Sequence, residues 1–155
     1  MRFNTKDITY YNQPFDHWVL DNFLDVNDAK KLSNQFIDFD NPTEEIIHYK
    51  GWIGEKRTCN RWDRFPPLTY STFSNLLSDK FIDKLSNITG ITPLYPDIGL
   101  HGGGWHMSGK GGSLAMHLDY SIHPKINLQR KLNLIIYLEE DYDPEWGGSL
   151  QFWSH

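Results

Sequence analysis

A histidine and an aspartate two residues apart, His117 and Asp119, are the residues of this chain whose types and spacing could do chemistry. In an extended strand, side chains two residues apart leave the same face, so these two lie a few ångströms from one another. An imidazole nitrogen and a carboxylate oxygen at that separation can chelate a metal ion. They are two of the three ligands of the facial triad that holds non-haem Fe(II) and leaves coordination positions open. The spacing therefore predicts a metal site with His117 and Asp119 as ligands.

The sequence around this pair has the two-residue period of a strand. Over residues 113–120 apolar and polar residues alternate, which predicts a strand with one apolar face. That face carries Leu114, Met116, Leu118 and Tyr120. Residues 131–138 predict a strand buried on both faces, and residues 149–153 predict another. Glycine-rich turns separate these strands, at 102–104, 109–112 and 147–148.

Before Gly90 the sequence favours helices. Residues 15–20 predict a short strand, and Asp25 is the predicted N-cap of a helix of about three turns. Two prolines at 66–67 open a second helix. A third helix starts at Ser78 and stops at Gly90, where a glycine can take the left-handed conformation of a helix end.

Residues 41–64 show no hydrophobic period, which predicts a long surface loop that folds over a site. Its cationic residues, expected in solvent, are Lys56, Arg57, Arg61 and Arg64. Three further histidines lie near the predicted metal site in the sequence. His101 and His106 either line a substrate cleft or pack against loops, and His123 is expected in solvent.

Three segments together resemble a known family. They are residues 112–120 with the His-x-Asp pair, residues 130–138 with the pattern Arg-x-Leu-x-x-x-x-Tyr-Leu, and residues 145–150 with a Trp-Gly-Gly turn. In this order and at these distances they resemble the 2-oxoglutarate- and Fe(II)-dependent dioxygenases, in particular the prolyl 4-hydroxylase-like branch. The resemblance extends over nearly the whole chain and is sharpest from Gly99 onward.

The resemblance implies an α+β fold, a double-stranded β-helix (jelly roll) with supporting N-terminal helices. Residues 1–155 form one dioxygenase-like domain on this basis, with 1–90 as the helical support and 91–155 as the first part of the jelly roll. A jelly roll needs eight strands, and about half of them are expected here, so the prediction is an incomplete one. Uncovered strand edges predict pairing with a second copy, which gives a homodimer by strand exchange.

The resemblance also implies an activity and its site. The reaction is hydroxylation of a prolyl or other side chain, or of a small molecule, with succinate and CO2 as co-products. Its cofactors are Fe(II) and 2-oxoglutarate, with ascorbate to protect the iron. His117 and Asp119 are the implied iron ligands, Tyr137 binds the 2-oxoglutarate carboxylate, and Asn133 and Leu150 line the same pocket.

One departure from the family leaves alternatives open. The family has a distal histidine with an Arg or Lys beyond it that pairs with 2-oxoglutarate. Here His155 is the candidate third ligand, and no basic residue follows it. The chain is therefore either an oxygenase, a truncated fragment, or a catalytically silent jelly-roll domain that binds a partner through its aromatic surface. A two-ligand metal site with hydrolytic or isomerase chemistry is a further alternative.

Composition narrows the class of protein. The 155 residues suit one domain, and 15 Lys and Arg against 20 Asp and Glu give a net charge of -5, without a basic run that could follow a phosphate backbone. No apolar stretch is long enough to span a bilayer, no signal peptide opens the sequence, and the single Cys59 cannot form an internal disulfide. We expect a cytoplasmic protein whose partner is a protein or small-molecule substrate, with neither nucleic acid nor membrane involved.

Overall fold

The fold is described from a computed structural model, which describes residues 1–35 and 56–153. Residues 41–55 of the loop predicted over 41–64 lie outside the described residues, as does the candidate ligand His155. The chain divides into two units, Met1–Gln35 with Leu138–His155, and Phe36–Tyr137. Each unit is described by itself.

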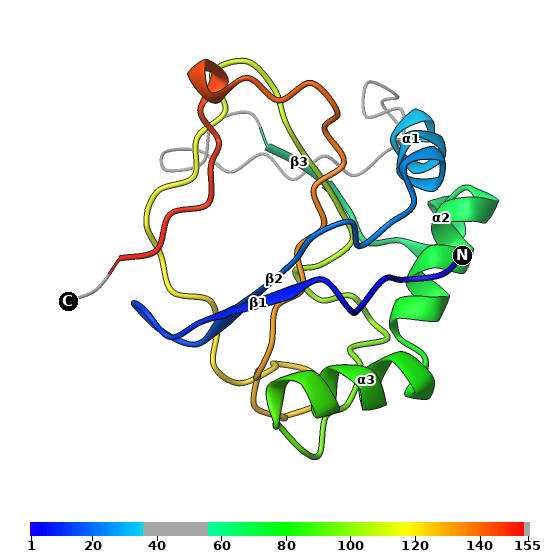
Figure 1. Cartoon of the computed structure of the whole chain (residues 1–155), viewed down its shortest axis with the longest axis vertical. Coiled ribbons are helices and arrows are strands. Elements are labelled where there is room, and N and C mark those ends of the chain that lie inside the picture. The colour runs from blue at the N-terminus through cyan, green and yellow to red at the C-terminus, as the bar shows by residue number, and fades with distance from the viewer. Residues whose placement is uncertain (36–55, 154–155) are drawn as a thin grey trace. The chain divides into compact units, whose positions relative to one another are not determined.

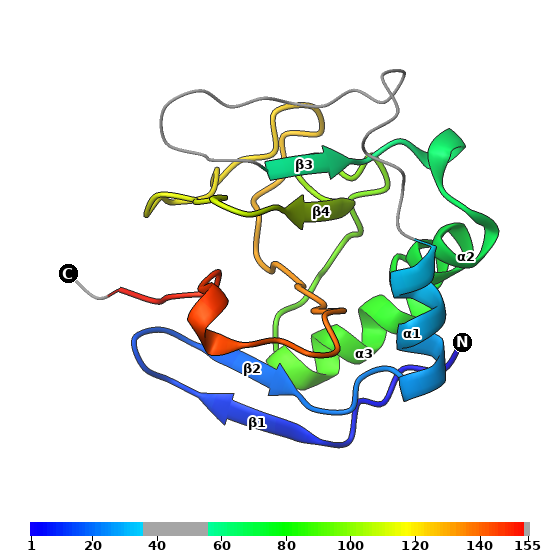
Figure 2. The same cartoon turned by 90° about the horizontal axis from the view of Figure 1, so that it is seen from above.

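The first unit opens with a β-hairpin. Strands β1 (Ile8–Tyr11) and β2 (His17–Leu20) pair antiparallel and lie side by side in Figures 1 and 2. Tyr10 lies opposite Trp18, and their ring centroids are 5.4 Å apart. Such aromatic cross-strand pairs stabilise a two-stranded ladder. Strand β2 confirms the strand predicted from the sequence, whereas β1 was not predicted.

Helix α1 (Val26–Asn34) follows the hairpin. The carboxylate of Asp25 accepts hydrogen bonds from the main-chain N–H groups of Asn27 (2.9 Å) and Asp28 (3.4 Å). These two donors have no partner within the helix, so Asp25 satisfies them as an N-cap. Leu32 is buried on the inner face of the helix. The predicted capped helix is confirmed.

Two further helices belong to the second unit. Helix α2 (Pro67–Leu76) begins at a proline, whose fixed φ suits the first helical position. Helix α3 (Asp79–Thr89) ends at Gly90, which has φ +73° and donates its N–H to the carbonyl of Ser86 at 2.8 Å. A left-handed residue is needed at such a helix end, and glycine adopts it without steric cost. Both predicted helices are confirmed.

A second antiparallel ladder joins β3 (Lys56–Cys59) to β4 (Trp105–Ser108), as Figure 2 shows. Cys59 lies opposite Trp105, and both residues are buried. A short 3-10 turn, Trp62–Arg64, follows β3. The predicted surface loop is therefore wrong over residues 56–59 and 62–64, because pairing with β4 satisfies the backbone groups of β3 and a 3-10 turn follows it.

A cluster of aromatic rings packs around the buried Phe65 in the second unit. Phe65 and Phe73 stack with their centroids 5.0 Å apart, and Trp62 meets Tyr70 edge to face at 5.0 Å. The indole N–H of Trp62 donates to the carbonyl of Ile98 at 2.9 Å. This cluster joins the 3-10 turn to helix α2 and to the segment that leads into β4.

The strands predicted after residue 112 do not form among the described residues. Residues 113–120, 131–138 and 149–153 include no hydrogen-bonded strand there, and a complete jelly roll is absent from the described part. Isolated bridge residues occur at Leu114 and, beyond these segments, in the pair Ile122 and Gln129. A strand needs a neighbour for its backbone groups, and sequence period alone cannot supply one.

The predicted burial of these segments is wrong in the same way. Met116 and Leu118 are 74% and 91% exposed, so the expected apolar face is uncovered. Along residues 131–138, Leu132, Ile136 and Leu138 are half-buried, whereas Leu134 is 40% exposed. Ile135 and Tyr137 are exposed, however, so this segment is not buried on both faces.

The described chain thus combines helices with small antiparallel sheets, which is a mixed α and β architecture. Within residues 1–35 and 56–153, none of the helices is both long enough and apolar enough to cross a membrane.

Gly104 is expected to be irreplaceable where β4 begins. Its φ is +96°, and an added Cβ would overlap the carbonyl oxygen of Cys59 and lie 2.8 Å from Cα of Asn60. We expect Gly104→Ala to lower the free energy of unfolding by about 3 kcal/mol, because backbone strain and overpacking each cost about 1–3 kcal/mol. Urea unfolding followed by tryptophan fluorescence measures this loss.

Gly111→Ala is the matched control. Gly111 also has a positive φ, of +80°, but no atom lies within 4 Å of the added Cβ. This substitution should cost only about 1 kcal/mol of strain. Equal losses at the two positions would contradict the close approach of Gly104 to β3.

Candidate metal site

His117 is held in one tautomer by the backbone. Its Nδ1 lies 2.8 Å from the carbonyl oxygen of Ala115. A carbonyl can only accept, so Nδ1 carries the proton and donates it. Nε2 is then left with its lone pair, which is the state of a histidine that binds a metal while its other nitrogen donates to a carbonyl. The side chain is 36% exposed.

Asp119 divides its two carboxylate oxygens between two partners. Oδ1 lies 3.7 Å from Nε2 of His117, and Oδ2 lies 3.2 Å from Nη2 of Arg130. Two donors on one metal ion at right angles are about 3 Å apart, given bonds of about 2.1 Å. Nε2 and Oδ1 therefore need only a small side-chain adjustment to share an ion, and their chemistry fits Fe(II).

Arg130 is packed on an aromatic ring. Its guanidinium lies 4.7 Å above the centroid of the Tyr120 ring, a cation–π contact. The hydroxyl of Tyr120 donates to the carbonyl oxygen of His101 at 2.9 Å, which fixes the ring. The sequence interpretation did not include Arg130 in the site.

A hairpin, residues 121–130, brings Arg130 to Asp119. The N–H of Arg130 donates to the carbonyl of Ser121 at 2.9 Å, and the N–H of His123 donates to the carbonyl of Leu128 at 2.8 Å. Asn127 takes the left-handed conformation in the turn, with φ +53°. The chain reverses there, and Arg130 lies beside the residues that follow Asp119.

The side chain of His123 stabilises the turn of this hairpin through hydrogen bonds. Its Nδ1 accepts from the main-chain N–H groups of Lys125 (3.1 Å) and Ile126 (3.3 Å). Nε2 therefore carries the proton, and it lies 3.3 Å from Oδ2 of Asp97. The residue is 7% exposed, so its expected place in solvent is wrong. The imidazole accepts from the backbone of its own turn and packs against the rings of His101 and Tyr120, which cover it.

Asp97 organises the loop on the other side of His123. Its Oδ1 accepts from the N–H of Gly99 at 3.0 Å, and its Oδ2 accepts from the N–H of His101 at 2.7 Å. The His101 ring lies 5.1 Å from the His123 ring and 5.4 Å from the Tyr120 ring. Of the two alternatives for His101, packing against neighbouring loops describes its contacts.

Positive charge also lies near the site, on β3. Lys56, expected in solvent, is half-buried, and this burial lowers its pKa, while the negative charge of Asp119 acts in the opposite direction. His106 is an exposed residue whose ring is nevertheless partly desolvated by surrounding atoms. That desolvation and the charge of Lys56 lower the pKa of His106, so its imidazole is neutral at pH 7.

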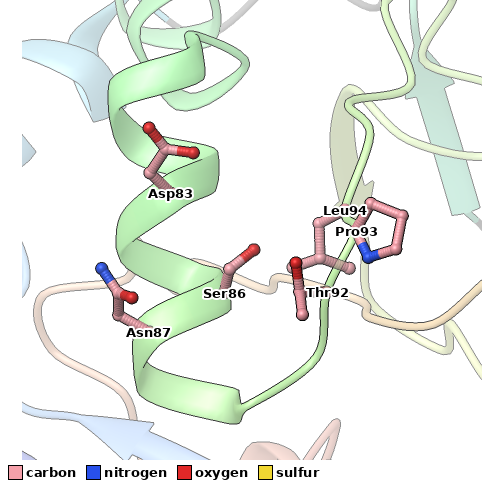
Figure 3. A pocket seen from close by; sticks show the side chains of 6 residues that line it. All are labelled: Asp83, Ser86, Asn87, Thr92, Pro93 and Leu94. Atoms are coloured by element: carbon pink, nitrogen blue, oxygen red, sulfur yellow. The ribbon is translucent and has the colours of Figure 1, made fainter.

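A cavity of about 270 Å³ opens beside Asp119. It is lined by residues 119–121 and 129–133, which include Arg130 and Asn133. A larger cavity, of about 380 Å³, lies between α3 and the segment after Gly90. Figure 3 shows its six lining side chains, three from each side, and they include no imidazole. The smaller cavity is therefore the one next to the candidate ligands.

The predicted site residues fall into two groups. The structure brings His117 beside Asp119, and Asp119 and Asn133 both line the smaller cavity. Tyr137 is in the same unit and is 66% exposed. Leu150 belongs to the other unit and is 53% exposed. Among residues 1–35 and 56–153, no three His, Cys, Asp or Glu side chains come close enough together to hold one metal ion.

Comparison with known proteins bears on the same region. Residues 103–155 match the family model described as the 2OG-Fe(II) oxygenase superfamily. This match supports that superfamily. It supports an oxygenase-type enzyme that uses Fe(II) and 2-oxoglutarate, without distinguishing the prolyl 4-hydroxylase-like branch among oxygenases. No curated protein and no solved structure matches the chain.

The acceptor role of His123 leads to a testable difference between two substitutions. His123→Phe keeps a ring of similar size but leaves the N–H groups of Lys125 and Ile126 without their acceptor. We expect these two amides to exchange with solvent about 10-fold faster, since a lost hydrogen bond costs about 1–1.5 kcal/mol. NMR-detected hydrogen exchange measures the rates.

His123→Asn is the matched control, because an asparagine side-chain oxygen can accept from the N–H two residues ahead. The amide of Lys125 should keep most of its protection in this variant. The same acceleration in both variants would mean that ring packing, rather than the acceptor, holds the turn.

Proposed function

We propose that this protein is an Fe(II)- and 2-oxoglutarate-dependent dioxygenase of the prolyl 4-hydroxylase-like branch, with His117 and Asp119 as iron ligands. The observation that carries the proposal is the pairing of Nε2 of His117 with Oδ1 of Asp119, at 3.7 Å, while the remaining polar atoms of both side chains are engaged elsewhere. The family match over residues 103–155 supports the same chemistry.

The residues of the chain perform separate tasks in this proposal. The carbonyl of Ala115 keeps the proton on Nδ1 of His117, so that Nε2 can donate to the metal. Asp119 supplies one negative oxygen. Bound Fe(II) and 2-oxoglutarate supply the activation of O2 that hydroxylates a C–H bond, with succinate and CO2 as co-products.

The cavity beside Asp119 is the proposed place for a ligand. Arg130, Lys131 and Asn133 surround it with donors, and Leu132 adds an apolar wall. Such a mixture suits a small carboxylic acid or a polar side chain. We propose a prolyl or other protein side chain, or a small molecule, as the substrate, with ascorbate keeping the iron reduced. Tyr137 and Leu150 stay proposed 2-oxoglutarate contacts on the family pattern.

A second function, a catalytically silent binding domain, is favoured by one observation. The described residues bring together two metal-binding side chains and not three. A domain that binds a partner without turnover needs no third ligand. A measurement of metal binding distinguishes the two functions, because an oxygenase must bind a metal through His117 and Asp119, whereas a silent binding domain does not depend on a metal.

The test is anaerobic Fe(II) titration in the presence of 2-oxoglutarate, followed by the weak visible charge-transfer band of the chelated unit. The wild-type chain should develop the band. His117→Ala and Asp119→Ala should weaken Fe(II) binding by at least about 100-fold, because even changes around metal ligands cost 10–100-fold.

His17→Ala is the control. Nδ1 of His17 also bonds the carbonyl two residues earlier, at 2.9 Å from the oxygen of Phe15, but none of the ion pairs in the described part includes His17. This variant should bind Fe(II) like the wild type. A folded wild-type protein without the band would favour the silent domain.

A further inference from the structure

We propose that Arg130 is a positioning residue of the metal site, which holds one oxygen of Asp119 so that the other stays directed at His117. This inference rests on the proposed function, since it concerns the same site. Nη2 of Arg130 lies 3.2 Å from Oδ2, whereas Oδ1 faces Nε2 of His117. With Oδ2 engaged, the carboxylate offers a single oxygen to a metal and leaves more positions open for other ligands.

Arg130 is itself fixed more firmly than the carboxylate it holds. Its side chain is 20% exposed, against 48% for Asp119. The guanidinium lies over the Tyr120 ring, and the main chain of Arg130 is bonded to Ser121 across the hairpin. A guanidinium is planar and carries its charge in a fixed plane, so a fixed plane determines the side from which it contacts a carboxylate.

The support of Arg130 continues away from the site. Tyr120 is fixed through its hydroxyl on the carbonyl of His101, and the N–H of His101 donates to Asp97. Asp97 also faces His123, which holds the hairpin turn. Both the ring under Arg130 and the backbone that bears Arg130 therefore depend on the same carboxylate, Asp97.

Two effects of Arg130 on a cation oppose each other. Its positive charge repels the cation, which weakens binding, while its contact with Asp119 keeps a ligand in place, which strengthens binding. The repulsion is screened by salt at this half-exposed site. Loss of an outer residue that contacts and orients a metal ligand typically costs 10–100-fold in metal affinity. Positioning should therefore outweigh repulsion. Removal of Arg130 weakens metal binding if the residue positions Asp119, and strengthens metal binding if it only repels the cation.

The test is Mn(II) binding to the full chain, followed by the EPR signal of free Mn(II). Arg130→Met removes the charge and the contact, and Arg130→Lys keeps the charge but loses the planar fork. We expect binding weakened about 10-fold by Arg130→Met and by an intermediate factor in Arg130→Lys. His117→Ala gives the baseline without the site.

Lys125→Met is the matched control. Lys125 lies on the same hairpin and carries the same charge, but it does not line the cavity and makes no ion pair with Asp119 in the described structure. Its loss should change Mn(II) affinity by less than about 2-fold, or tighten binding slightly, as expected when only repulsion is removed.

The outcomes separate this inference from the proposed function. Unchanged or tighter Mn(II) binding in Arg130→Met, beside a wild type that binds, overturns the positioning role and leaves the metal site standing. A wild type that binds neither Mn(II) nor Fe(II) overturns the proposed function and this inference with it. Exchange of the Lys125 amide reports whether each variant keeps the hairpin. If Arg130→Met loses the hairpin, the test rests on Arg130→Lys. Wild-type Mn(II) affinity in Arg130→Lys then overturns the inference.

Discussion

The ion pair between Asp119 and Arg130 is the interaction on which the candidate site depends. It contributes little to folding, because a pair with a carboxylate that is 48% exposed adds at most about 1 kcal/mol. Its effect is on direction. Without it, the Asp119 carboxylate is free to turn about its side-chain bonds, and its approach to His117 becomes one conformation among several. A weak contact in a defined place therefore determines whether two nearby residues act together.

The hairpin that supplies Arg130 is built from local hydrogen bonds around one buried histidine. His123 gives the turn an acceptor for two N–H groups, those of Lys125 and Ile126. Burying an imidazole is costly unless its polar atoms are paired. Nδ1 has two donors, whereas Nε2 lies 3.3 Å from Oδ2 of Asp97 without forming a hydrogen bond. The aromatic cluster around helix α2 also supports the Asp97 loop, because the indole N–H of Trp62 donates a hydrogen bond to the carbonyl oxygen of Ile98.

Features that depend on neighbouring residues in the sequence could be predicted, and features that depend on a distant partner could not. The Asp25 cap, the proline that opens α2 and the Gly90 stop act within a few residues, so their residue types determine the outcome. Strand β3 was taken for loop because its partner β4 lies far along the chain. The strands predicted after residue 112 failed for the converse reason, since a two-residue period gives no backbone partner.

The site shows the same division. The spacing of His117 and Asp119 follows from local geometry, whereas their supports come from elsewhere. His123 was placed in solvent because a histidine in a polar loop usually lies there, and nothing in its neighbours reveals Asp97. A usable signal did exist for Arg130: a Pro at 124 and an Asn at 127 favour a reversal that returns the chain to Ser121.

The effect of an oriented carboxylate on metal affinity depends on the number of protein ligands in the site. In a site with three protein ligands, a loosely held carboxylate is compensated by the other two. With two donors, the entropy of fixing each side chain is a larger share of the binding free energy, so an already oriented carboxylate has a larger effect. The described part of this chain brings together two such donors, and both have their second polar atom already bonded. Orientation of the ligands is therefore what this part of the chain contributes to metal binding, beyond the ligands themselves.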